Sequence, residues 1–242
     1  MNFTYSAYEE MLSLLKENRY EVCKYETYQH SKRCVILRHD VDLSLGAALR
    51  FAELEHKNGV QSTYFILLST SFYNLFHRKA SDIIREIKAM GHDIGLHFDE
   101  ANYSISTKEE LIHYVQKEIS IMSQGLGTEI KTVSMHRPSK WVLEADVKFD
   151  TVINSYGKEF FNEFKYLSDS RMHWREDVHQ VIESNDYERL HILTHPIWYG
   201  IEESTMRERL KEFIRAQKYN CYDSVRENIR DLDEVLLKAD IE

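Results

Sequence analysis

Apolar and polar residues alternate along the chain in blocks that predict strands and helices in turn. The unbroken apolar run 34–37 indicates a strand buried on both faces, as in a parallel sheet. Apolar residues at helical spacing follow over 45–52 and end before the Asn58-Gly59 pair, a helix stop signal. A second apolar run over 63–68 completes a strand–helix–strand unit, so we predict an α/β fold with parallel strands.

This alternation of strands and helices continues along the chain. Further strands are expected over 92–99, 132–135, 152–153, 166–167 and 190–194, with helices over 80–87 and 107–124 between them. A capping box at Ser6 begins an N-terminal helix at about 6–18, and Thr205 begins a helical tail at about 204–240. No Gly/Ser/Pro-rich linker or fixed-period repeat divides the chain, so a single domain over 1–242 is expected.

Five of the predicted strands end in polar or ionisable residues. They are Asp40 and Asp42, His97 and Asp99, His136 and Arg137, Asp169, and His195. The carboxyl ends of parallel strands carry ligand-binding and catalytic groups, and side chains two residues apart on a strand share a face. Asp40 and Asp42 are therefore expected to point the same way. The alternative is that this pair caps the next helix, since Asp42 and Ser44 precede it.

Composition restricts the class of protein. The chain has 242 residues, of which 43% are hydrophobic, enough for a full core. A formal net charge of −9 argues against sequence-independent nucleic-acid binding, so a substrate is expected to be neutral, or anionic only where local basic groups receive it. The three cysteines lack Cys-x-x-Cys spacing, which fits a reducing compartment. The sequence shows no signal-peptide pattern and no apolar run of membrane length, so we expect a cytoplasmic protein.

The order of the polar clusters over about residues 34–200 resembles that of the polysaccharide deacetylases of carbohydrate esterase family 4, the NodB-homology proteins. The segments that carry this resemblance are Arg38-His39-Asp40-Val41-Asp42, Gly91-His92-Asp93-Ile94-Gly95-Leu96-His97, His136-Arg137-Pro138 and Leu193-Thr194-His195. The family fold would make the chain an irregular (β/α) barrel of about seven strands. The resemblance also implies that Asp40 is a general base, that Asp42 and His97 are metal ligands, and that His195 is a general acid.

One position departs from the family pattern. The second metal-binding histidine should lie four residues after His97, where this chain has Ala101. His136 and Asp99 are both chemically competent to supply the third ligand of a divalent ion, for which we expect zinc. We favour His136, because Asp99 can instead cap a following helix. Either His136 or Arg137 can occupy the family's arginine position, and we favour Arg137 as the group that orients the general base.

The activity that the resemblance implies is metal-dependent hydrolysis of an N-acetyl group on an acetylated sugar or a surface-glycan precursor. Aromatic residues near the strand ends, which either pack in the core or stack on sugar rings, are Trp141, Trp174, Trp198 and Tyr199. Because Ala101 breaks the ligand pattern, a catalytically silent carbohydrate-binding or scaffold protein on the same barrel is the first alternative. A metal-free hydrolase of a cyclic amide is the second.

Overall fold

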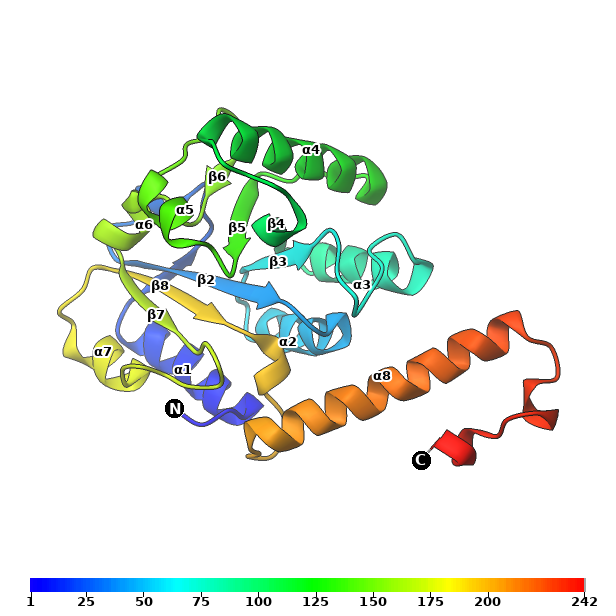
Figure 1. Ribbon diagram of the computed structural model, residues 1–242. Coiled ribbons are helices and arrows are strands. Elements are labelled where there is room, and N and C mark those ends of the chain that lie inside the picture. The colour runs from blue at the N-terminus through cyan, green and yellow to red at the C-terminus, as the bar shows by residue number, and fades with distance from the viewer. Residues whose placement is uncertain (242) are drawn as a thin grey trace. The chain divides into compact units, whose positions relative to one another are not determined.

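The computed structural model describes residues 1–241, and its contacts divide them into two compact units, Met1–Glu203 and the segment that begins at Ser204. The first unit is a curved sheet of parallel strands with helices around it (Figure 1). Its strands are β1 Glu21–Cys23, β2 Cys34–Val41, β3 Thr63–Leu67, β4 Asp93–Asp99, β5 Thr132–His136, β6 Ile153–Asn154, β7 Lys165–Ser168 and β8 Arg189–Thr194. They pair in the order β6-β5-β4-β3-β2-β8-β7, and β1 also pairs with β2. The predicted irregular (β/α) barrel of about seven strands is confirmed.

Helices α1 to α4 follow one another around the outside of this sheet in Figure 1. The helices of the first unit are α1 Tyr5–Glu17, α2 Leu45–Lys57, α3 Arg78–Ala89, α4 Lys108–Leu126, α5 Lys140–Ala145, α6 Lys158–Asn162 and α7 Val178–Ser184, with short 3₁₀ helices η1 Tyr28–His30, η2 Glu100–Asn102 and η3 Pro196–Trp198. Thr107 and Glu110 form the predicted capping box of α4. The cap of α1 is Thr4, whose hydroxyl accepts a hydrogen bond from the Ala7 N–H at 3.1 Å, so the prediction of Ser6 as this cap is wrong.

Strand β2 is buried along its whole length, and its two faces lie in different parts of the core. Leu37 packs in the larger apolar cluster with residues of α1 and α2, whereas Ile36 packs inside the barrel with aromatic side chains. The same alternation places Arg38 and Asp40 inside the barrel and His39 on the outer face. The strand that carries the predicted general base is thus fixed from both sides.

His39 belongs to a fully buried polar cluster between β2 and α2. Its Nε2 lies 3.0 Å from Oε1 of Glu55, and its Nδ1 lies 2.6 Å from the Thr194 hydroxyl, so the cluster connects α2 with the ends of β2 and β8. Glu55 also accepts hydrogen bonds from the hydroxyl groups of Tyr8, Ser62 and Tyr64. Burial disfavours the carboxylate, but His39 and these contacts outweigh burial and lower the pKa of Glu55 to about 2.

The second unit contains helix α8, Met206–Asn228, followed by the short 3₁₀ helices η4 Leu232–Glu234 and η5 Lys238–Ile241. Thr205 caps α8, as predicted, by accepting a hydrogen bond from the Glu208 N–H at 3.2 Å. The Tyr222 hydroxyl donates to Asp233 at 2.8 Å, which ties the segment after α8 to the helix. Every helix formed by the described residues is too short or too polar to span a membrane. The single-domain organisation and the cytoplasmic location remain predictions.

Candidate metal centre and catalytic site

The predicted site residues lie at the carboxyl ends of β2, β4, β5 and β8. His97 Nε2 is 3.1 Å from Oδ1 of Asp42 and 3.7 Å from Oδ2 of Asp40, so the two carboxylates face one imidazole, as strand alternation predicts. The Ser44 hydroxyl caps α2 by accepting a hydrogen bond from the Ala47 N–H at 3.2 Å. Because Ser44 caps the helix, the aspartate pair is not needed for that role.

Three of these side chains converge on one point and form a candidate metal centre. The Oδ1 atom of Asp42, the Nε2 atom of His97 and the Nδ1 atom of His136 lie 3.1 to 3.4 Å from one another. In a tetrahedral zinc site with bonds of about 2.0–2.1 Å, neighbouring ligand atoms are about 3.3 Å apart, so the observed spacing fits. One carboxylate oxygen and two imidazole nitrogens are also a donor set that zinc accepts.

Burial and unsatisfied polar atoms at this point also favour a cation. His97 is 2% exposed, and among the described residues neither its Nδ1 nor Oδ1 of Asp42 has a well-aligned hydrogen-bond partner. Buried polar atoms without partners are uncommon, and an ion bound to Oδ1 would satisfy one of the two. Burial disfavours the Asp42 carboxylate, but contacts from His136 and His97 outweigh burial and hold the pKa of Asp42 well below its usual value. The carboxylate is therefore in the charged form that binds metal.

Arg38 is the residue that holds Asp40. Its Nη2 donates to both carboxylate oxygens of Asp40, at 2.9 and 2.7 Å, and to the Ser134 hydroxyl at 2.6 Å, while its Nη1 donates to Ser155 at 3.0 Å. Both members of the ion pair are buried, with 0% and 4% of their side chains exposed. Burial disfavours the carboxylate, but Arg38 outweighs burial and lowers the pKa of Asp40. These contacts correct the prediction that Arg137 orients Asp40.

Arg137 instead pairs with Asp99 at the rim of the site. Its Nη2 donates to Oδ2 of Asp99 at 2.9 Å, and Oδ1 of Asp99 accepts a hydrogen bond from the Ala101 N–H at 3.1 Å, which caps η2. Asp99 thus has the capping role that weighed against it as a ligand. The atoms that converge with His97 come from Asp42 and His136, as the preferred ligand set predicts.

His195, which is partly buried, pairs with the buried carboxylate of Asp169, a residue that the sequence identifies only as a strand end. The Nδ1 atom of His195 lies 2.6 Å from Oδ1 of Asp169, and the backbone N–H of His195 donates to Oδ2 at 3.0 Å. The Nε2 atom of His195 faces the candidate metal centre, 3.9 Å from Oδ2 of Asp42. Burial disfavours the imidazolium, but Asp169 outweighs burial and raises the pKa of His195 to about 9. At neutral pH the ring is therefore protonated.

A groove of about 560 Å³, a volume in the range of small-molecule sites, opens beside the candidate metal centre. Asp42, His136 and Arg137 line it, and the loop after β3 contributes hydroxyl and aromatic side chains. Of the four aromatic residues that the sequence offers for stacking on sugars, none is among the described residues that line this groove. Trp174 and Tyr199 are buried in the larger apolar core, so packing explains them.

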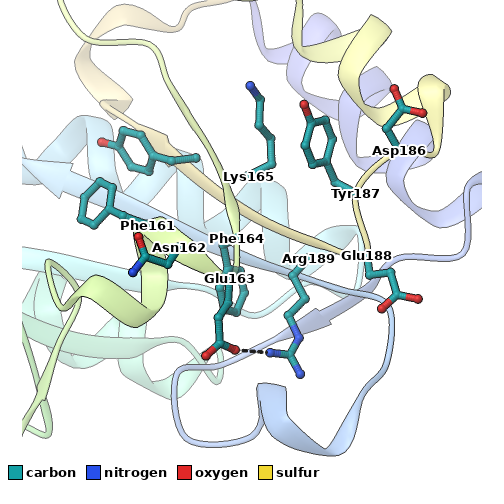
Figure 2. Close-up of a pocket in the computed structure, with 10 residues that line it drawn as sticks. Phe161, Asn162, Glu163, Phe164, Lys165, Asp186, Tyr187, Glu188 and Arg189 are labelled. Carbon is teal, nitrogen blue, oxygen red and sulfur yellow. Dashed lines mark hydrogen bonds and ion pairs between the residues drawn. The ribbon is translucent and has the colours of Figure 1, made fainter.

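A second hollow, of about 600 Å³, lies at the opposite, amino-terminal ends of β7 and β8 (Figure 2). Figure 2 shows Arg189 paired with Glu163, at 2.7 Å, and Lys165 lies 2.7 Å from Glu176. The Lys165 ammonium is also 5.2 Å from the centre of the Tyr187 ring. These two cations are thus already paired, and none of the described residues that line this hollow belongs to the candidate metal centre.

No protein-family model matches the chain, and no curated protein matches it. Solved structures similar to the chain come from carbohydrate esterase family 4, the family that the motifs resemble. A pseudoenzyme of that family from Bacillus anthracis is 15% identical and aligns over 78% of this chain, which spans only 62% of the pseudoenzyme, with a TM-score of 0.45. A family 4 carbohydrate esterase from the same species is 15% identical over 86% of this chain and 85% of that one, with a TM-score of 0.45. The chitin deacetylase of the fungus Colletotrichum lindemuthianum is 15% identical over 76% and 81%, with a TM-score of 0.43.

Proposed function

We propose that the protein is a zinc-dependent hydrolase that removes an N-acetyl group from an acetylated sugar, such as a precursor of a surface glycan. The observation that carries this proposal is the convergence of Asp42, His97 and His136 between the buried carboxylate of Asp40 and the imidazole of His195. Hydrolysis of an amide requires a base for the attacking water and an acid for the leaving nitrogen. The two groups that flank the convergence point supply that pair.

Asp40 is the general base of the proposed reaction. Arg38 keeps its carboxylate ionised and fixed in position, so the carboxylate can accept a proton from an attacking water. Asp42, His97 and His136 make up the three protein ligands that catalytic zinc sites normally use, without a side chain from position 101. A divalent cation held there supplies Lewis acidity toward the acetyl carbonyl and a lowered pKa for water.

His195 is the general acid. Asp169 occupies its Nδ1, which leaves the proton on Nε2 directed toward the metal centre. With a pKa of about 9 the ring carries this proton at neutral pH and can donate it to the departing nitrogen. The C–N bond then breaks to give acetate and a free amine on the sugar.

Zinc titration and acetate release from N-acetylated sugars test the proposal together. The wild-type protein should bind one zinc per chain and release acetate, whereas Asp40→Asn should keep its zinc and lose about 10²–10⁴-fold in rate. If Asp40→Asn loses its zinc, Asp40 is a ligand and the assigned roles are wrong. A wild-type protein with neither zinc nor acetate release would favour the catalytically silent carbohydrate-binding protein. Turnover that survives complete chelation would favour the metal-free cyclic amide hydrolase.

A further inference from the structure

The backbone bends at Arg137 so that two consecutive residues face the same groove. Arg137 has a φ of +46°, in the left-handed region that residues other than glycine rarely adopt, and Pro138 follows it. Consecutive residues of an extended strand would point to opposite faces, yet His136 and Arg137 both line the groove. The strained bend therefore places a guanidinium next to the candidate metal centre.

Most of the N–H donors of the Arg137 guanidinium are not used by its ion pair. Arg38 makes the contact with Asp40, so Arg137 is not required for it. Arg137 is 71% exposed, and its one ion-pair partner among the described residues is Asp99, reached through Nη2 alone. A guanidinium has five N–H donors, of which this pair uses one. Asp99 is itself held by the Ala101 N–H, and its pair with Arg137 leaves most of the donors of the guanidinium for a ligand.

Arg137 is also the sole lysine or arginine among the described residues that line the groove. In a chain of net charge −9, an anionic substrate is repelled unless a local cation receives it. We propose, on the basis of the proposed function, that the groove binds an acetamido sugar that carries a carboxylate or a phosphate group, and that Arg137 binds this anion. A planar guanidinium suits both groups because it can offer two parallel donors to two oxygens.

Three sugars that differ only at C6 test this inference: N-acetylglucosamine, its 6-phosphate, and the 6-carboxylate 2-acetamido-2-deoxyglucuronic acid. Calorimetry on the zinc-loaded protein gives the dissociation constants, and acetate release is followed in parallel. At least one charged sugar should bind about tenfold or more tightly than the neutral sugar, with a smaller preference at high salt. The comparison of the two charged sugars shows whether phosphate or carboxylate is preferred.

Substitution of Arg137 should change this preference selectively. Arg137→Gln should remove the preference for the charged sugar, and Arg137→Lys should keep part of it, because lysine retains the charge but not the planar fork. The matched control is Lys140→Gln, which should retain the full preference. Lys140 is 88% exposed, pairs with Glu144 and is not among the described residues that line the groove.

Equal affinity for all three sugars in the wild-type protein, or a preference that survives Arg137→Gln, would overturn this inference. Failure of the proposed function has a different signature, because then none of the three sugars releases acetate. If the neutral sugar binds with the same affinity as the charged sugars and is deacetylated at the same rate, the proposed function stands and the anion-binding role of Arg137 is refuted.

Discussion

Replacing Arg38 with methionine should destabilise the protein, because it leaves a buried carboxylate unpaired. Methionine keeps an apolar stem but lacks the guanidinium, which donates to both oxygens of Asp40 and to the hydroxyls of Ser134 and Ser155. Since Arg38 is 0% and Asp40 4% exposed, solvent cannot replace these contacts. Removing one partner of a buried ion pair costs about 3–5 kcal/mol, which for a unit of this size lowers the melting temperature by roughly 6–20 °C.

The size of this loss should depend on pH. In the wild-type protein the pKa of Asp40 is lowered, so its carboxylate contributes stability above the unfolded pKa of about 3.9. That contribution is lost as the pH falls through the folded pKa, which is lower still. In Arg38→Met, burial raises the pKa of Asp40 without Arg38 to oppose it. The deficit in stability should therefore be largest near neutral pH and shrink in acid, and the acidic limb of the activity profile should move to higher pH.

Urea unfolding followed by circular dichroism from about pH 4 to about pH 8 measures this deficit. The double variant Arg38→Met/Asp40→Asn removes the charge together with its partner and should recover about 2 kcal/mol or more at neutral pH. Arg85→Met is the matched control, because Arg85 pairs with Asp82 at 2.7 Å but is 58% exposed, so its loss should cost less than about 1 kcal/mol. If Arg38→Met loses no more stability than Arg85→Met, or if the double variant is no more stable than Arg38→Met, the reasoning is refuted.

Substitutions also separate the metal ligands from the general acid. The variants His136→Ala and Asp42→Ala should have a lower zinc content, measured by atomic absorption, whereas Asp99→Ala should retain its zinc. If Asp99→Ala loses zinc and His136→Ala keeps it, Asp99 is the third ligand. His195→Ala should keep its zinc and lose about 10²–10⁴-fold in rate, and loss of the ion would make His195 a ligand. Because Asp169 raises the pKa of His195 to about 9, activity should fall as the pH rises through that value. Asp169→Asn should move this basic limb of the pH–activity profile to lower pH. An unchanged limb would contradict a role for the Asp169–His195 pair.

Periodicity and the chemistry of strand ends are sufficient to predict a sheet of parallel strands and the edge at which the candidate site lies, whereas the barrel and the metal are expected from the family resemblance. Apolar runs that end in ionisable residues mark β2, β4, β5 and β8, and the carboxyl ends of parallel strands meet at one edge. The pairing of Asp169 with His195 is different, because it requires that β7 lie beside β8, which spacing along the chain does not reveal. The elements β1, α5, α6 and α7 are three to seven residues long, too short to show a period.

A signal for the buried cluster around Glu55 does exist in the sequence. The apolar stripe that predicts α2 continues from Leu45, Ala48 and Ala52 to position 55, where a carboxylate stands. A buried carboxylate requires partners that donate hydrogen bonds, and the outer face of β2 supplies one in His39. A charged residue on an apolar stripe therefore predicts a polar cluster, although the partners become known only from the packing.

The role of Arg38 follows from the same alternation that places Asp40 beside Asp42. An arginine in a strand buried on both faces needs an anion on its own face, because an unpaired buried charge costs several kcal/mol, and Asp40 two residues later is that anion. The family motif points instead to Arg137, which would have to reach Asp40 inside the barrel in order to orient it. Since Arg38 already balances the charge of Asp40, Asp40 does not require Arg137, whose guanidinium lies at the groove against Asp99. Because Arg38 pairs with Asp40, Arg137 is not needed to orient the general base. Its guanidinium is therefore available for the role that we propose, discrimination between charged and neutral substrates.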